Sequence, residues 1–387
     1  MKEFLGEKKM FTKGAFREVN SEQSSHPDAI VSRYLQGVAM GSFGFVEVGS
    51  GTMNISKEDV KFPIQPLLTY DGLFNILSYL FTICIPICIF GIFSNIVNIL
   101  VFYKVGFSSP TNISLFCLAI ADLVTLCFAL LASFGNHPAF QNTDLIISMW
   151  DISRIGIHVY FSSCAIGSWI TAVINMERSV CVVFPMKVKR IFTRKTTVSL
   201  VVAMVIYQIA SGLPRSFAAQ LAWSTSALTN RTRISYVVID PELVGLSFLV
   251  SFPIPNMVCF ILVILGTFFL IRNFKKSRHL RSKMSGTGDK SNKLSDKDVR
   301  LVRSMIFIST IYICGAAPNV LLYIVSSAYP SLQVDNPYLR NLHTLFLLIV
   351  MVVQVTSCSI NIFVYLRMGS NFKNKLREMF CCRSADS

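Results

Sequence analysis

Hydrophobic and charged positions are separated into long blocks along this chain. Runs without a single Asp, Glu, Lys or Arg occupy residues 72–103, 105–121, 123–143, 155–176, 196–214, 243–271, 304–334 and 341–366. Joining the second and third runs across Asp122 gives seven segments, each reaching the roughly 20 apolar residues that a helix needs to cross the hydrocarbon core of a bilayer. The pattern predicts an all-α membrane protein, a bundle of seven transmembrane helices over residues 72–366.

The composition agrees with this prediction. Hydrophobic residues make up 52% of the 387 positions and charged residues only 15%. Typical soluble domains carry about 25% charged residues. The sequence therefore indicates that lipid, rather than water, surrounds much of the chain.

The distribution of Lys and Arg predicts the orientation of the bundle. The segments 104–111, 177–195, 272–303 and 367–387 hold 23 of the 36 basic residues, whereas the opposite loops hold five. Short cytoplasmic loops accumulate basic residues, so this set is expected inside. We therefore expect a multi-pass protein of the plasma membrane with an extracellular amino terminus and a cytoplasmic carboxyl terminus. The basic residues lie in linkers between spans and not on one compact domain, which argues against nucleic acid as a partner.

The two terminal regions carry signals of their own. The tail 1–71 has mixed charge and few long apolar periods, so we expect it to be extracellular and largely disordered. Asn-x-Ser/Thr sequences at Asn54 and Asn230 are predicted glycosylation sites on the outer side. Residues 367–387 contain the amphipathic stretch SNFKNKLREMF, expected as a short cytoplasmic helix, followed by the candidate palmitoylation sites Cys381 and Cys382.

An adjacent acid and base, Glu177 and Arg178, end the third apolar segment. The sixth segment begins with SDKDVRLVRSMIF, which brings Asp298 to the same side of the membrane. A pair between Arg178 and Asp298 would hold two helix ends together, and its separation would open a basic-walled cavity on the cytoplasmic face. The alternative is an interfacial arginine that reaches toward water.

Motifs in order along the chain resemble those of class A, rhodopsin-like G-protein-coupled receptors over about residues 70 to 380. They are Asn95 in GIFSN, Asp122 in LAIAD, Glu177-Arg178-Ser179 with Pro185 seven residues later, Phe252 and Pro255 in FPIP, Asn361 to Tyr365 in NIFVY, and Phe372. Longer stretches such as RSVCVVFPMKVKRIFTRK and SINIFVYLRMGSNFK are similar to invertebrate, mollusc-type chemosensory receptors, a group that borders FMRFamide-type peptide receptors.

This resemblance implies a receptor that binds an extracellular small molecule or peptide and activates a heterotrimeric G protein. It implies a coupling end of the bundle formed by Glu177, Arg178, Asp298, Pro185 and Tyr365.

The resemblance also implies a sodium site. Asp122 would share the ion with Asn95, Ser357 and Asn361, since acids inside a membrane commonly mark function. A protonated Asp122 that makes a hydrogen bond between helices is the alternative.

The resemblance also suggests where a ligand would bind. Tyr160 stands where amine receptors have an aspartate, and Val355 stands where opsins attach retinal, so amines and light are not expected as stimuli. The candidate pocket residues are Tyr160, Phe161, Cys164, Arg215, Tyr323 and Gln354. Ordinary helix packing is the alternative for most of them. Arg154 and Arg215 favour an acidic or carboxylate-bearing ligand, although arginines at the ends of spans are commonly interfacial.

Several residues depart from the family pattern. Ser153 replaces the cysteine that commonly ties the third helix to the second outer loop, and residues 218–241 contain no cysteine. The outer loops must then be ordered by packing or remain mobile. Ala316 replaces an aromatic residue of the sixth span, Ile362 a proline of the seventh, and Ser179 a tyrosine. We therefore expect the activation route to differ in the middle of the bundle.

Two other functions fit a seven-span chain less well. A transporter predicts internal repeats and polar groups that meet at the bilayer centre, and neither is evident here. A seven-span scaffold without signalling is made conceivable by the replacements at Ser179, Ala316 and Ile362. An enzyme is not expected, because the sequence lacks metal-ligand spacing, a phosphate-binding glycine loop and a nucleophile constellation.

Overall fold

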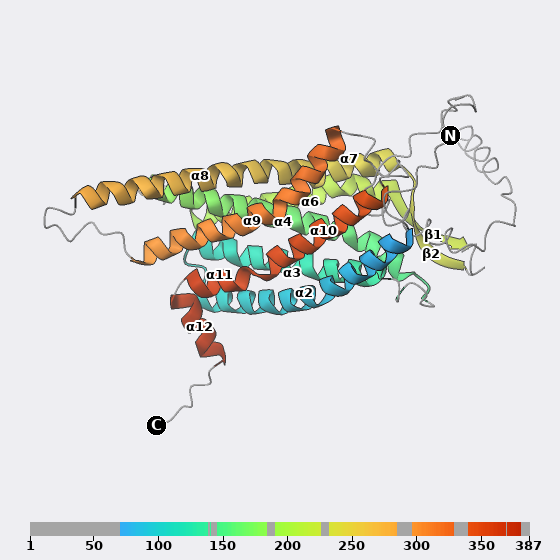
Figure 1. Ribbon diagram of the computed structural model, residues 1–387, viewed down its shortest axis with the longest axis horizontal. Helices are drawn as coiled ribbons and strands as arrows, with labels where there is room; N and C mark the ends of the chain where they lie inside the picture. Colours follow the sequence, from blue (N-terminus) through green and yellow to red (C-terminus); the bar gives the residue numbers. More distant parts are fainter. Residues whose placement is uncertain are drawn as a thin grey trace, which may run out of the picture.

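Helices that run along one long axis make up most of the computed structural model (Figure 1). It describes residues 70–137, 140, 145–183, 190–225, 232–284, 296–328, 340–368 and 370–380. The helices are α2 (Tyr70–Val105), α3 (Pro110–Asn136), α4 (Met149–Val183), α6 (Arg194–Ala218), α7 (Pro241–Ser251), α8 (Pro253–Met284), α9 (Asp296–Ala328), α10 (Arg340–Ser359), α11 (Asn361–Met368) and α12 (Ser370–Phe380). Seven candidate membrane spans lie within these ranges, with α7 and α8 forming one span and α10 and α11 another. The predicted seven-helix bundle is thereby confirmed, and the chain is a multi-pass membrane protein.

Some predictions fall on parts of the chain outside the described residues. They concern the tail 1–69, Asn54, Asn230, Pro185, Cys381 and Cys382. Glycosylation and palmitoylation therefore stay predictions.

The helices place apolar side chains outward and polar side chains inward. Large apolar residues such as Phe93 and Ile206 are more than half exposed on the outside of the bundle. Ser94, Asn95 and Asn175 are buried. Lipid suits the exposed apolar surface, and buried polar groups in hydrocarbon must find partners on neighbouring helices. Polar contacts between helices therefore specify how the bundle packs.

Helix α4 lies at the centre of this arrangement. It contacts α3, α6, α8 and α9, whereas α6 lies at the periphery and contacts α3, α4 and α7. The largest buried apolar cluster joins α2, α3, α4 and α11 at one end of the bundle, and it includes Leu115, Ile170 and Tyr365. The end that carries this cluster is called the α12 end below.

The seventh span is interrupted although it lacks a proline at position 362. Helix α10 ends at Ser359 and α11 begins at Asn361, so the helix breaks at Ile360. Two side chains of α2 bond to the carbonyl oxygens next to the break: Asn95 Nδ2 donates to Cys358 O at 3.1 Å and Ser94 Oγ donates to Ser359 O at 3.1 Å. Side chains that enter a helical hydrogen-bond ladder are a recognised cause of such breaks.

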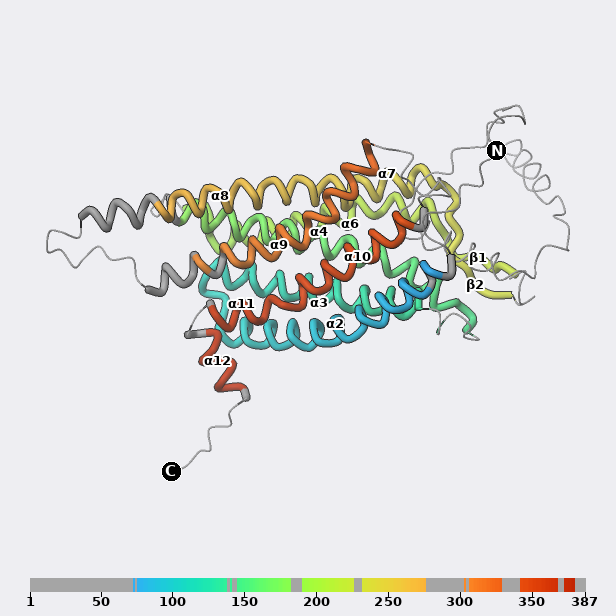
Figure 2. The backbone as a smooth tube through the Cα atoms, viewed as in Figure 1, coloured from blue at the N-terminus to red at the C-terminus, as the bar shows by residue number. Residues whose placement is uncertain are grey.

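A proline accompanies the bend in the sixth span. Helix α9 changes direction in its second half (Figure 2), and Pro318 lies inside it. Proline removes one backbone hydrogen bond and its ring crowds the preceding turn, so it bends a helix at this point.

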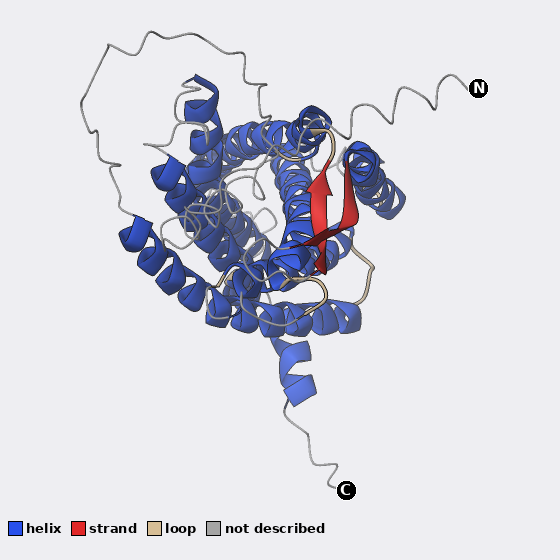
Figure 3. Cartoon of the chain, turned by 90° about the vertical axis from the view of Figure 1, so that its right-hand side faces the viewer, coloured by secondary structure: helices blue, strands red, loops and turns tan. Residues whose placement is uncertain are grey.

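A β-hairpin lies at the opposite end of the bundle. This end is called the hairpin end below. Strands β1 (Ala219–Thr225) and β2 (Thr232–Val238) pair antiparallel, with Ala219 opposite Val238. Figure 3 shows the hairpin lying over one side of the ring of helices. Without a disulfide, polar contacts of Tyr236 hold it: its backbone N–H donates to Asp151 Oδ1 at 3.1 Å, and its carbonyl accepts from Arg154 Nη1 at 3.3 Å. The two strands are therefore held in place by packing and hydrogen bonds.

The side chain of Arg154 also lies over the ring of Tyr236. The guanidinium carbon of Arg154 lies 5.0 Å from the centre of the Tyr236 ring. Burial raises the pKa of Tyr236, and the nearby Arg154 and Arg215 offset only part of that rise, so the hydroxyl stays protonated at physiological pH.

A short amphipathic helix follows the last span, as predicted. Helix α12 turns away from the bundle axis (Figure 1). Its Phe372 is buried, and the ring centre lies 5.2 Å from that of Phe102 and 5.8 Å from that of Tyr365. This aromatic contact anchors α12 to α2 and α11.

The closest packing between α3 and α4 predicts that Gly135→Ala destabilises the protein. A Cβ at Gly135 would lie 2.5 Å from the backbone oxygen of Met149 and 2.5 Å from Ser153 Cβ. Overpacking of this kind costs about 1–3 kcal/mol. Thermal unfolding in detergent, read with a thiol-reactive dye that reports the exposure of buried cysteines, should show a clear fall in Tm.

Gly212→Ala is the matched control. No atom lies within 4 Å of a Cβ built at Gly212, so this change should leave Tm unchanged or raise it slightly. Equal Tm values for Gly135→Ala and the unmodified protein would contradict the close α3–α4 contact.

Candidate functional site

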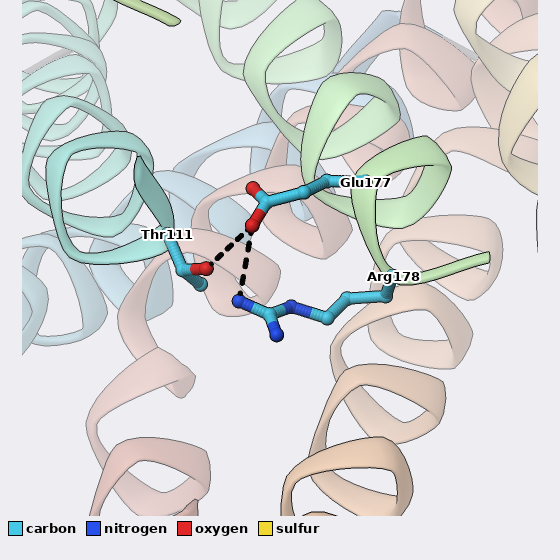
Figure 4. Close-up of polar contacts among 3 residues, drawn as sticks. All are labelled: Thr111, Glu177 and Arg178. Atoms are coloured by element: carbon cyan, nitrogen blue, oxygen red, sulfur yellow. Dashed lines mark hydrogen bonds and ion pairs between the residues drawn. The ribbon is translucent and has the colours of Figure 1, made fainter. Parts of the chain in front are cut away.

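The acid and base at the end of α4 form a small buried polar cluster (Figure 4). Glu177 Oε1 accepts a hydrogen bond from Thr111 Oγ1 at 2.7 Å and one from Arg178 Nη2 at 3.2 Å. Glu177 is only 6% exposed. The cluster therefore ties Arg178 to α4 and, through Thr111, to the start of α3.

The predicted partner of Arg178 lies where side chains are not described. Asp298 belongs to the first turn of α9, and the described part of that helix contacts α4 further along. A pair between Arg178 and Asp298 stays a prediction. Glu177 Oε2 and Arg178 Nε have no hydrogen-bond partner among the described residues, so the cluster keeps bonding capacity for a further group.

One turn toward the hairpin end, Asn175 joins three helices. Its Nδ2 lies 3.1 Å from Val263 O, 2.7 Å from Thr267 Oγ1 and 2.9 Å from Ser309 Oγ. The first two acceptors belong to α8 and the third to α9. Asn175 is not among the residues predicted from the sequence, although a polar side chain inside an otherwise apolar span is a usable signal.

Ser179 has a structural role that a tyrosine could not fill. Its hydroxyl lies 2.9 Å from both Asn175 O and Gly266 O. A Cβ at Gly266 would lie 2.9 Å from Asn175 Oδ1, which shows how closely α4 and α8 approach. The small residues Ser179 and Gly266 thus permit the contact between these helices at the α12 end.

Asp122 lines a small cavity in the middle of the bundle. The cavity offers about 30 Å³ to the centres of water-sized molecules. Asp122 is 6% exposed, and its Oδ2 accepts a hydrogen bond from Asn361 Nδ2 at 2.7 Å. The space suffices for one or two waters or a small ion. The remaining lining residues are Leu118, Cys164, Gly167, Ser168, Thr171, Ile308, Ile311, Tyr312, Gln354, Ser357, Cys358 and Asn361.

Three of the four predicted sodium residues therefore meet, and the fourth does not. Asp122, Ser357 and Asn361 line the cavity, whereas Asn95 lies outside the lining. The Asn95 amide donates to Gly91 O at 2.9 Å and to Cys358 O, beside the break of the seventh span. Its role is to join α2 to α10, a use that spacing along the sequence did not reveal.

A larger cavity lies between α2, α3, α4, α9 and α10, nearer the hairpin end. It offers about 70 Å³ to the centres of water-sized molecules, and most of its walls are apolar. Its lining residues are Leu77, Phe81, Ala132, Asn136, Ile157, Tyr160, Phe161, Phe252, Asn319, Thr344, Leu347, Leu348, Val350, Met351 and Gln354. It is called the central pocket below. Gln354 lines both this pocket and the Asp122 cavity.

The six predicted ligand residues are divided among different places. Tyr160, Phe161 and Gln354 line the central pocket, while Cys164 lines the Asp122 cavity. Tyr323 packs edge-on against Phe252 with 6.1 Å between ring centres, behind the wall of the central pocket. Arg215 lines a separate hollow between α4 and α6, because α6 lies at the periphery of the bundle.

Together these groups form a polar column through the bundle. At the wall of the Asp122 cavity, Ser168 Oγ donates to Asn256 Oδ1 at 2.9 Å, and Tyr312 Oη lies 3.4 Å from the same oxygen. Asn175 and the Glu177–Arg178 pair continue the column to the α12 end. Such a column can transmit a shift of one helix to the next. Within the described residues, no three His, Cys, Asp or Glu side chains lie close enough together to hold a metal ion.

Comparison with known proteins agrees with this architecture. Residues 82–383, most of the chain, match the family described as "Serpentine type 7TM GPCR chemoreceptor Srw". The chain is also similar to the candidate G-protein coupled receptor F59B2.13 of Caenorhabditis elegans, with 29% identity over 123 residues. That match covers 30% of this chain and 29% of the relative's length. From its seven apolar spans and the match along most of its length, the chain belongs to the Srw family of serpentine seven-transmembrane G-protein-coupled chemoreceptors.

Proposed function

We propose that this protein is a plasma-membrane receptor that binds a small molecule or peptide at its hairpin end. Binding would promote nucleotide exchange on a heterotrimeric G protein at its α12 end. The observation that carries this proposal is the buried cluster in which Glu177 pairs with Arg178 and accepts from Thr111, at the end of the bundle opposite the central pocket. Family membership favours this function over a transporter or a signalling-silent scaffold.

The charge distribution supports the orientation in which the α12 end is cytoplasmic. The linkers and the helix at that end hold most of the basic residues, whereas the opposite loops hold five bases and five acids. Helix α12 presents Lys373, Lys375 and Arg377 along a short amphipathic segment, which suits the acidic inner leaflet.

The ligand class follows from the central pocket and from the resemblance. Its apolar walls with a few polar groups, among them Tyr160 and Gln354, suit a ligand that buries apolar surface and makes a small number of hydrogen bonds. The resemblance to invertebrate, mollusc-type chemosensory receptors, a group that borders FMRFamide-type peptide receptors, favours a small chemosensory molecule or a peptide. No acid lines the pocket among the described residues, so a counter-ion for an amine is missing there.

The polar column suggests how binding would reach the G protein. At rest Glu177 holds Arg178 within α4, and Asn175 holds α4 against α8 and α9. A ligand that shifts α9 or α10 would act on the groups around Asp122 and then on Asn175. Outward movement of α9 would release Arg178, in the way that two packed arrangements of helices exchange in switching proteins. Asp298 would stabilise the resting arrangement.

Sodium binding at Asp122 is a further part of this proposal. The groups available fit the ion: one carboxylate with an oxygen not engaged by Asn361, the Ser357 hydroxyl, and space for a small ion and water. Hard cations prefer such oxygen ligands. Bound sodium would supply a positive charge that balances Asp122 and stabilises the resting arrangement. A protonated Asp122 hydrogen-bonded to Asn361 is the alternative.

Exchange of Arg178 tests the proposed coupling. Purified receptor in lipid nanodiscs would be combined with G protein, and GTPγS binding measured with and without panels of FMRFamide-type peptides and small chemosensory molecules. Arg178→Ala should abolish the ligand-dependent signal. Glu177→Gln should raise basal exchange several-fold, because the arginine loses its charged partner.

Arg194→Ala is the matched control for this experiment. Arg194 lies at the α12 end and donates to Ser108 O at 2.9 Å, but it is exposed and outside the buried cluster. It should leave basal exchange unchanged. Full ligand-dependent exchange with Arg178→Ala would contradict the proposed role, and silence of the unmodified receptor across the panels would favour the scaffold.

Charge reversal at Asp298 tests the predicted contact between α4 and α9. If Asp298 stabilises the resting arrangement, Asp298→Lys should raise basal GTPγS binding at equal expression. Asp296→Lys is the control, because residues two apart point to different sides of a helix. Equal basal exchange for both variants would remove the Arg178–Asp298 pair from the mechanism.

Sodium binding predicts an ion-specific change in stability. Sodium chloride should raise the Tm of the receptor above its value in choline chloride at equal ionic strength, and Asp122→Asn should abolish that difference. The protonated alternative predicts equal Tm values in the two salts for the unmodified protein. The measurement needs neither agonist nor G protein.

A further inference from the structure

A second hollow lies outside the central pocket, between α4, α6 and strand β2. It offers about 410 Å³ to the centres of water-sized molecules, which is within the range of small-molecule sites. Its lining residues are Ile155, His158, Val159, Ser162, Ile166, Val205, Gln208, Ile209, Gly212, Arg215, Ser216, Ala219 and Tyr236. It is called the lateral pocket below. Neither the proposed ligand site nor the polar column uses it.

The lateral pocket opens toward the lipid side of the bundle. Three of its apolar residues, Ile155, Val159 and Ile209, are 40%, 40% and 61% exposed. They lie on the two helices α4 and α6 that form its long walls. A hydrocarbon chain could therefore enter from the bilayer and remain in contact with apolar side chains throughout.

The closed part of the lateral pocket holds a buried cation. Arg215 is 5% exposed, and its Nη2 donates to Ser251 Oγ at 3.1 Å. Its Nε has no hydrogen-bond partner, and no salt bridge to Arg215 is found among the described residues. Burying a guanidinium in hydrocarbon without a counter-ion costs free energy, so an anion bound beside Arg215 would be stabilised.

The groups near Arg215 include a further hydrogen-bond donor and a second cation, which also favour a bound anion. His158 lines the pocket, and its Nε2 lies 3.4 Å from Tyr236 Oη. If the Tyr236 hydroxyl donates to His158 Nε2, the ring proton of His158 lies on Nδ1. Nδ1 has no hydrogen-bond partner within the described part of the chain. Arg154 adds a second guanidinium beside Tyr236.

Neither Asp151, which contacts Tyr236, nor Gln208, which lines the pocket, forms an ion pair with Arg215 among the described residues. Asp151 carries one negative charge and can balance one of the two guanidinium groups at most; its two oxygens accept from Tyr236 N at 3.1 Å and Ser148 Oγ at 2.6 Å. Gln208 also lines the pocket, where its Nε2 donates to Ser251 O at 3.1 Å. Its Oε1 has no described partner and can accept from a hydroxyl or a protonated acid.

We propose that the lateral pocket binds an amphipathic carboxylate of the fatty-acid type, which enters from the bilayer. The carboxylate lies against Arg215 and His158, and the hydrocarbon chain lies along the apolar residues of α4 and α6. Arginine binds a carboxylate through two parallel N–H donors, and an ester carbonyl, which is uncharged and offers a single acceptor oxygen, cannot form this pair. This proposal does not depend on G-protein coupling.

Photo-crosslinking of the purified full chain tests the proposal. The receptor in phosphatidylcholine nanodiscs would be labelled with palmitic acid that carries a diazirine and an alkyne, and the labelled peptides identified by mass spectrometry. We expect saturable labelling within residues 155–166 and 205–216. Unlabelled palmitate should compete for the site, whereas methyl palmitate, which has the same chain without the charge, should not.

Two variants address the head and the chain of the ligand separately. Arg215→Gln should reduce labelling about ten-fold, and Arg272→Gln, at an exposed arginine of α8 outside the lateral pocket, should not change it. Gly212→Phe should block the pocket, because no atom lies within 4 Å of a Cβ at Gly212 and the ring can occupy open space. This second variant keeps the test valid if Arg215→Gln fails to fold.

Several outcomes would overturn the proposal. One is equal competition by methyl palmitate, and another is labelling that neither Arg215→Gln nor Gly212→Phe reduces. Preferential displacement by phosphatidic acid over palmitate would assign the pocket to a phospholipid phosphate and reject the carboxylate.

Discussion

Hydrocarbon supplies no hydrogen bonds, and this constraint governs the interior of the bundle. Each polar side chain inside the spans must find its partner on its own helix or on a neighbour. Asn95, Asn175 and Asn361 each do so across a helix contact, on α10, on α8 and α9, and on α3 respectively. Apolar side chains give the spans their length, and these few amides fix which helix faces which. Charge and hydrogen bonding are therefore concentrated along the line through which the proposed signal passes.

Much of the fold could be predicted from the sequence, because the property that specifies it is local. Twenty consecutive apolar residues define a span wherever they occur, and an amphipathic stretch after the last span defines α12. The hairpin could not be predicted in this way. Its order depends on Asp151 and Arg154, more than 80 residues away along the chain, meeting Tyr236.

The candidate site was predictable in part for the same reason. Asp122, Glu177 and Arg178 were found because charges within or beside apolar runs are conspicuous, and Asn361 was found through the resemblance to class A receptors. Thr111, Asn175 and Ser168 were missed, since a single neutral polar residue in a span becomes significant only when its partner is known. Asn95 lies outside the lining of the Asp122 cavity and Arg215 outside that of the central pocket, because spacing gives the helix and not the direction of the side chain.

The hairpin has a consequence for how this protein can be made and kept. All nine cysteines among the described residues are free thiols, and the hairpin is joined to α4 by hydrogen bonds and a stacked guanidinium. In the class A receptors that this chain resembles, a disulfide commonly ties this outer loop to the third helix, and such a bond forms in seconds to hours and is broken by reductants. The contacts that hold strands β1 and β2 involve no thiol, so a reductant in an expression host or a buffer has no bond to break there.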